Sequence, residues 1–214
     1  MCIRDRFERY RDANGLLSNL PYWNFVDWIR TDMEGANFET NALYARFLDD
    51  LGMLAHALGR DADFRRWSAE AVKVKASLRK LHWDAQAGLF AGSFRDGKQS
   101  SMFTETANGM ALLFDIATKE QAAAIVKNLR AAVPHLQRAS PLYVYYAFEG
   151  LIHAGAADAA LDLMRKRYTA MLEASDAPTL WETWPEWRTQ PGYGAAVTSY
   201  VHSGSASPCW TLSK

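Results

Sequence analysis

The 214-residue sequence predicts an all-α fold, an α/α toroid built of helical hairpins, and three observations carry this prediction. Apolar residues recur at three- and four-residue steps through most of the chain, which is the spacing of amphipathic helices. Short glycine-containing turns join these helices in pairs, near residues 38–81, 102–132 and 141–172, and longer loops separate the pairs. Wholly apolar helices alternate with amphipathic ones, as inner and outer helices of a toroid do, and no alternating strand pattern predicts a βαβ sheet.

The first pair is predicted at residues 38–58 and about 61–81, on either side of Gly59. Asp61 or Asp63 is expected to cap the second of these helices. Residues 83–97 contain two turn signals around an apolar patch, which predicts a small β excursion.

The second pair is predicted at residues 102–116 and 118–132. Glu105 and Asn108 stand among apolar residues in the first of these helices, and Thr118 opens the second with a capping-box pattern.

The third pair is expected at residues 142–154, preceded by Ser140–Pro141, and at residues 156–172. A last helix is expected to begin within residues 195–202.

Composition and charge exclude several classes of partner. The 24 basic and 24 acidic residues cancel without forming runs, so neither nucleic acid nor an anionic membrane surface is expected as a partner. No window approaches the ~18 apolar residues of a membrane span. Cys2 and Cys209 lack metal-ligand spacing, so no zinc site is expected. Cellular compartment and oligomeric state stay open.

The segment Thr179–Trp187 holds three tryptophans and two carboxylates within nine residues: Trp181, Glu182, Trp184, Glu186 and Trp187. Carboxylates are costly to bury, and an indole N–H needs a partner, so a helical core has little use for this mixture. A carbohydrate-binding cleft uses both, because aromatic faces stack on sugar rings while a carboxylate exchanges a proton. The alternative is an aromatic loop that caps a helical bundle.

A second cluster of the same character lies at Leu20–Trp28, within a loop-like region of residues 14–37. Either Asp27 points into a cleft walled by indoles, including Trp23 and Trp28, or it caps a helix beside a hydrophobic plug. The similarity to the first cluster favours the cleft.

These motifs resemble the six-hairpin glycosidases, most closely the family 78 α-L-rhamnosidases. The resemblance rests on four segments in this order: Trp23–Trp28, Glu105–Leu113, Thr179–Trp184, and His202 with Ser205–Pro208. It implies an (α/α)6 barrel that hydrolyses terminal α-L-rhamnosides with inversion. It also implies that Glu182 is the general base and that His202 contacts a carbohydrate substrate. The other residues expected to bind substrate are Trp23, Asp27, Trp28, Trp181 and Trp184, and neither metal nor cofactor is required.

The sequence departs from the family pattern at two places. Gly204 stands where a tryptophan is usual, and no match to the family's acidic motif precedes the first aromatic cluster; Asp12 is a poor substitute. We therefore expect an incomplete barrel that lacks the general acid, and the fragment alone is expected to be inactive. Residues 1–13 are interpreted as a leader of doubtful origin, and residues 14–214 as the C-terminal part of the catalytic domain.

An inverting reaction needs two carboxyl groups roughly 6.5–9.5 Å apart, with a water on the base. Glu186 is the rival base, although its position after Pro185 favours a surface role. Two other functions stay open. A sugar isomerase or epimerase would pair His202 with a second histidine, and a non-catalytic helical scaffold would bind carbohydrate without turning it over.

Overall fold

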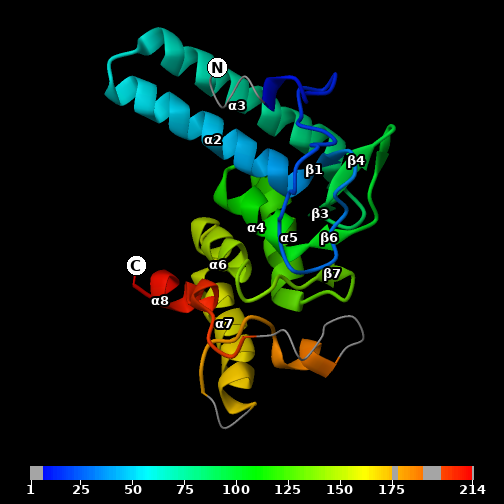
Figure 1. The fold of residues 1–214 in the computed structure, drawn as a ribbon, viewed down its shortest axis with the longest axis vertical. Coiled ribbons are helices and arrows are strands. Elements are labelled where there is room, and N and C mark those ends of the chain that lie inside the picture. Colours follow the sequence, from blue (N-terminus) through cyan, green and yellow to red (C-terminus); the bar gives the residue numbers. More distant parts are fainter. Residues whose placement is uncertain (1–6, 175–177, 190–198, 214) are drawn as a thin grey trace.

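The structure is a computed structural model that describes residues 7–174, 178–189 and 199–213. Helical hairpins follow one another along the long axis of the molecule, which confirms the all-α prediction (Figure 1). The paired helices are α2 (Phe38–Ala57) with α3 (Asp61–His82), α4 (Glu105–Leu113) with α5 (Lys119–Ala131), and α6 (Val144–His153) with α7 (Ala157–Glu173). Two 3-10 helices, η1 (Pro185–Thr189) and η2 (Ser203–Ser205), precede the short helix α8 (Ser207–Thr211).

The first hairpin begins at Asn37, whose side chain accepts a hydrogen bond from the Thr40 backbone N–H (2.9 Å) and so caps α2. The prediction that Asp61 or Asp63 caps α3 is wrong. Arg60 occupies the N-cap position and makes no side-chain capping bond. Asp61 and Asp63 lie in the first turn instead, where a carboxylate is favourable at the positive end of the helix dipole.

Helix α4 is shorter than predicted because the residues before it form a strand. Phe103–Thr104 (β6) pairs in parallel with Leu136–Gln137 (β7). The Thr104 hydroxyl then accepts a hydrogen bond from the Ala107 N–H (3.0 Å), which starts the helix. The capping box predicted for α5 is confirmed, since Thr118 and Gln121 exchange side-chain and backbone hydrogen bonds.

Helices α4 and α6 cross at two glycines. A Cβ atom on Gly109 would lie 2.5 Å from the Tyr146 carbonyl, and a Cβ atom on Gly150 would lie 2.4 Å from the Gly109 carbonyl oxygen. Only glycine permits this approach, because such distances are well inside van der Waals contact. The crossing brings the N-terminus of α4 close to the segment that leads into α6.

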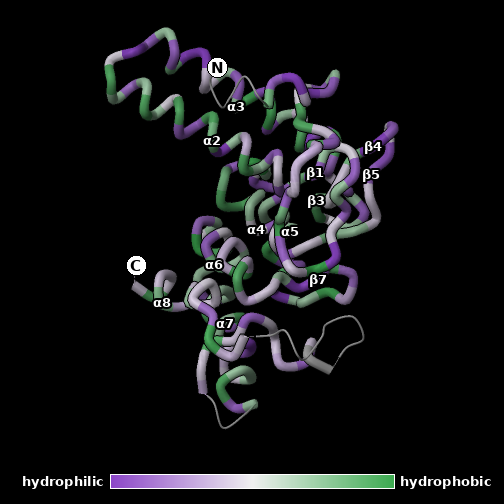
Figure 2. The backbone as a smooth tube through the Cα atoms, in the orientation of Figure 1, coloured by the Kyte–Doolittle hydropathy of each residue, from purple (hydrophilic) through white to green (hydrophobic). Residues whose placement is uncertain are grey.

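The predicted β excursion is confirmed. Trp83–Asp84 (β2) pairs with Leu89–Phe90 (β3), and Ser93–Arg95 (β4) pairs with Lys98–Gln99 (β5), both antiparallel. Strand β4 also pairs with Ala36–Asn37 (β1), which the sequence did not predict. The β4–β5 turn is hydrophilic (Figure 2), as expected for a hairpin that extends from the helices.

One apolar core runs through all three hairpins and includes the wholly buried side chains of Phe38, Phe90, Phe148 and Trp184. Arg11, in the segment before the first hairpin, forms an ion pair with Glu70 of α3. Its backbone also forms an isolated antiparallel β-bridge with Leu17. None of the helices among the described residues has the length and apolarity to cross a membrane.

The last helix expected within residues 195–202 falls partly on residues 190–198, which lie outside the described part of the chain. Residues 199–202 are not helical, and the final helix starts at Ser207.

Candidate active site

Two buried indoles anchor the tryptophan-rich segment. Trp184 is completely buried, and its Nε1 donates a hydrogen bond to the Ala139 carbonyl (2.7 Å). Trp181 is 2% exposed, and its carbonyl accepts a hydrogen bond from the Ser205 hydroxyl (2.6 Å). The sequence predicted both indoles as walls of the site, but the structure places them in the core. For Trp184, the hydrogen bond of the indole N–H inside the protein offsets the loss of its contact with water.

Glu182 lies between these two anchors and is half-buried. Its backbone N–H donates to the Ser199 carbonyl (2.9 Å), and its Oε2 accepts from the Ser199 N–H (3.0 Å). The carboxylate is thus oriented by main-chain groups while its side chain keeps partial contact with solvent. This environment suits a carboxylate that takes a proton from water.

Asp27 is a buried carboxylate that accepts hydrogen bonds from Trp28, Thr106 and Ser140. Its Oδ1 accepts from the Trp28 N–H (2.6 Å), and its Oδ2 accepts from the Thr106 hydroxyl (3.0 Å) and the Ser140 N–H (3.2 Å). Burial raises the pKa of Asp27 to about 6, although these hydrogen bonds oppose the rise. Asp27 therefore does not cap a helix. It joins the first aromatic cluster to α4 and to the entrance of α6.

A second buried carboxyl group, Glu39, lies beside Thr104, the N-cap residue of α4. Its Oε1 accepts from the Thr104 hydroxyl (2.8 Å) and its Oε2 from the Asn37 amide (3.0 Å). Burial raises the pKa of Glu39 to about 7, and the charge of Asp27 adds to this rise. The two carboxyl groups thus lie near enough to influence each other.

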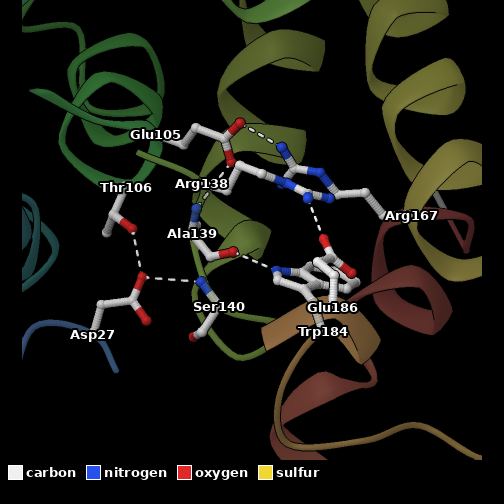
Figure 3. Close-up of polar contacts among 9 residues, drawn as sticks. All are labelled: Asp27, Glu105, Thr106, Arg138, Ala139, Ser140, Arg167, Trp184 and Glu186. Carbon is white, nitrogen blue, oxygen red and sulfur yellow. Dashed lines mark hydrogen bonds and ion pairs between the residues drawn. The ribbon is translucent and has the colours of Figure 1, made fainter. Parts of the chain in front are cut away.

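A third buried carboxylate, Glu105, forms a bidentate ion pair with Arg167 of α7. Both side chains are 2% exposed. The same carboxylate accepts the Ala139 N–H (3.0 Å), so it also fixes the segment before α6 (Figure 3). A charge pair with this many hydrogen bonds is compatible with burial.

The predicted aromatic residues of the first cluster are exposed. Trp23 is 86% exposed and Trp28 is 47% exposed. Phe25 contacts both rings, with centroids 5.6 Å and 4.6 Å away, and also meets Tyr143 at the entrance of α6 (5.7 Å). Burial raises the pKa of Tyr143 to about 12, with a contribution from the charge of Asp27. These rings give the Asp27 region an aromatic surface that a sugar face fits.

His202 lies beside the tryptophan-rich segment, because its N–H donates to the Leu180 carbonyl (2.8 Å). Its ring approaches the Ser205 hydroxyl (3.4 Å). A Cβ atom on Gly204 would lie 2.4 Å from the Leu142 side chain and 2.9 Å from the His202 ring, so a larger residue at this position would require both side chains to move. Gly204 and Tyr143 line a groove of about 420 Å³ between α6 and α8.

The structure brings the predicted residues together in two groups. Asp27 and Trp28 lie at the entrance of α6, while Glu182, Trp181 and His202 lie on the segment between α7 and α8. The segment Ala139–Ser140 joins the groups, since it binds Trp184 on one side and Asp27 on the other. Because every inner helix of a toroid ends at the same rim, the predicted fold implies that Asp27, Glu182 and His202 converge on one concave face; this convergence stays a prediction.

Sequence reasoning missed Glu39, Arg167 and the pairing role of Glu105. A signal was present for Arg167, which occupies a position in the apolar stripe of α7 where a surface arginine is not expected; the stripe contains Leu163, Met164, Tyr168 and Met171. Glu105 likewise stands among apolar residues, which marks it as a buried charge in need of a partner. No comparable signal identified Glu39.

The comparisons with known proteins agree with this architecture. The family model described as the bacterial α-L-rhamnosidase six-hairpin glycosidase domain matches residues 3–212, nearly the whole chain. The chain belongs to this family. Its structure resembles that of a family 78 rhamnosidase from Bacillus sp. GL1, with a TM-score of 0.85, 27% sequence identity and 98% of this chain covered.

Two further solved structures share the fold of this family member. A rhamnosidase from Klebsiella oxytoca with rhamnose bound has a TM-score of 0.78 at 20% identity over 96% of this chain. An α-L-rhamnosidase from Dictyoglumus thermophilum has a TM-score of 0.64 at 16% identity over 90% of this chain. The chain spans 22% of the Bacillus chain, 39% of the Klebsiella chain and 22% of the Dictyoglumus chain. No curated protein matches it.

The alternative site residues have other local partners in this six-hairpin domain. Glu186 forms an exposed ion pair with Arg138 (Figure 3), which agrees with the surface role expected for it. The five histidines each have a different neighbour rather than one another. His56 meets Phe64, His82 meets Phe38, His135 meets Phe103, His153 meets Asp115, and His202 meets Ser205.

Proposed function

We propose that the protein is a glycoside hydrolase that removes terminal α-L-rhamnosyl groups with inversion, and that Glu182 is its general base. Membership of the rhamnosidase family and the likeness to rhamnosidase structures support the substrate class. The observation that carries the assignment of the base is the setting of Glu182. It is a partly exposed carboxylate held by Ser199 between two indoles that are themselves fixed in the core.

In the proposed reaction, Glu182 takes a proton from a water molecule as the water attacks the anomeric carbon. The bond from that carbon to the leaving oxygen breaks, and a general acid protonates the leaving oxygen. Asp27 is proposed to hold sugar hydroxyl groups, with Trp23 and Trp28 supplying aromatic surface and His202 a further polar contact. Trp181 and Trp184 are buried in the core, where they anchor the segment that carries Glu182 and do not stack on the sugar.

The test compares Glu182→Gln with the wild type in hydrolysis of an aryl α-L-rhamnoside, with both proteins made in a version that carries the complete (α/α)6 barrel. Glutamine keeps the shape and the hydrogen bond from Ser199 but cannot take the proton, so kcat is expected to fall by about 100- to 10,000-fold. Sugar binding, measured separately by calorimetry with L-rhamnose, should change little.

Glu186→Gln is the matched control, because it makes the same change on the same segment at an exposed ion pair. It should keep nearly all activity. If Glu182→Gln retains more than about a tenth of the wild-type turnover, Glu182 is not the base. A wild-type protein that binds rhamnose without hydrolysing any rhamnoside would support the non-catalytic scaffold instead.

A further inference from the structure

The segment Arg138–Ser140 is held on both sides by groups from distant parts of the chain (Figure 3). The Ala139 N–H donates to Glu105, and the Ala139 carbonyl accepts from Trp184. The next N–H, that of Ser140, donates to Asp27. One dipeptide therefore connects the Asp27 loop with the segment that carries Glu182.

The buried ion pair of Glu105 and Arg167 contacts both Ala139 and Trp184, the two groups on the Glu182 side of this connection. The Arg167 Nη1 donates to Glu105 Oε2 (2.7 Å), the same oxygen that accepts the Ala139 N–H. The Arg167 guanidinium also lies over the Trp184 ring, 5.6 Å from its centroid. A single charge pair thus fixes the Ala139 N–H and the indole that binds the Ala139 carbonyl.

Stability alone is a poor explanation for such a pair. Two charges lose their hydration on burial, and apolar residues of similar volume often replace a buried ion pair without loss of stability. Three directional contacts between α4, α7 and the segment before α6 are what an apolar replacement would lack.

We propose that Glu105 and Arg167 are positioning residues. By holding Ala139 and Trp184 at fixed positions relative to each other, they fix the Glu182 segment relative to Asp27. The proposal rests on the function proposed above, because it gives the pair a role in setting the geometry of that site. Glu186 and Arg138 tie the same two segments at the surface, where an exposed pair contributes little.

The decisive variant is the double substitution Glu105→Gln with Arg167→Met. The glutamine oxygen still accepts the Ala139 N–H and methionine fills the volume of the arginine stem, so no buried charge is left unpaired. We expect the double variant to unfold within a few degrees of the wild type. We also expect kcat for an aryl rhamnoside to fall by about 10- to 100-fold, because small displacements of catalytic groups are costly.

A second readout does not depend on activity. Hydrogen exchange of the backbone amides in residues 181–187 should be about tenfold faster or more in the double variant, since Trp184 loses the buried Arg167 guanidinium from its ring. The matched control is Leu78→Ala, a buried α3 residue remote from the site, which lowers stability without touching this network. Leu78→Ala should speed exchange in residues 181–187 only by the amount that its lower global stability accounts for. Arg130→Gln, which removes the exposed ion pair with Asp158 of α7, should change neither readout by more than about twofold.

A double variant with wild-type kcat and wild-type exchange in residues 181–187 would overturn the proposal and leave the pair a structural feature. Failure of the proposed function has a different signature, because Glu182→Gln would then keep its turnover. In that case exchange in residues 181–187 still decides whether the pair holds the segment in place.

Discussion

Glu39 is a fully buried carboxyl group whose ionisation the fold opposes. Its pKa rises from 4.5 to about 7 on folding, so the native state holds the proton more tightly than the unfolded state does. Stability is therefore unaffected below the unfolded pKa, falls as pH rises through this interval, and stays lower above it. For Glu39→Gln, which removes this titration, the variant should gain on the order of 3 kcal/mol relative to the wild type between about pH 4 and pH 8.

The measurement is the free energy of unfolding by urea at several pH values. His82 titrates in both proteins, so its effect cancels in the difference. Asp27 interacts with Glu39, so the difference reports the titration of this carboxyl pair. Glu120→Gln is the control, because Glu120 is an exposed residue of the first turn of α5 whose pKa is lowered by its own backbone N–H. Its difference from the wild type should be constant from pH 5 upward. A constant difference for Glu39→Gln would show that folding does not change the pKa of this carboxyl group.

Residue types predicted the character of the site better than the roles of individual side chains. The mixture of tryptophan and carboxylate at Trp181–Trp187 predicted a binding segment, but the pattern of residue types in an irregular segment does not reveal which ring is buried. Trp184 is buried because the Ala139 carbonyl satisfies its N–H, and Ala139 is 45 residues away. Such a long-range partner has no local signature.

At the scale of elements, the crossing of α4 and α6 depends on Gly109. A methyl group there would press against the backbone of Tyr146, which cannot move aside as a side chain does. Gly109→Ala should therefore destabilise the protein by about 3 kcal/mol, despite the better helix propensity of alanine. Thermal or urea unfolding measures the change.

Gly52→Ala is the control for this prediction. Gly52 is also a buried glycine in a helix, but the tightest contact of a methyl group there is with the hydroxyl of Ser68 at 3.1 Å, which can rotate away; its next neighbours, Phe64 and the Ser68 backbone, lie at an ordinary 3.7 Å. This variant should be close to wild type or slightly more stable. Equal effects of the two substitutions would mean that the crossing tolerates a wider separation of the helices.

The helices themselves could be predicted from the apolar stripes, since each hairpin forms where its periodicity indicated. Helix ends were less predictable. The start of α4 is set by pairing of Phe103 with Leu136, a contact between residues that no local pattern connects. The start of α3 lacks the expected cap because Asp61 already lies in the helix.

At the scale of the molecule, the toroid-like succession of hairpins brings together loops that are far apart in sequence. Asp27 and Ser140 are separated by 113 residues, yet a hydrogen bond joins them at the N-terminus of α4. Each hairpin contributes one part of this meeting point: Glu39 from α2, Thr106 from α4 and Arg167 from α7. The sequence predicted that inner helices end at a common rim, but only the structure identified the residues that join there.

The central claim is that a water activated by Glu182 attacks the sugar in a single inverting displacement. The most direct test is proton NMR of the sugar first released when the wild-type protein hydrolyses an aryl α-L-rhamnoside. An inverting reaction yields β-L-rhamnose, which then mutarotates slowly to the equilibrium mixture. If α-L-rhamnose forms first, the reaction retains configuration, and Glu182 cannot be the base of a single displacement.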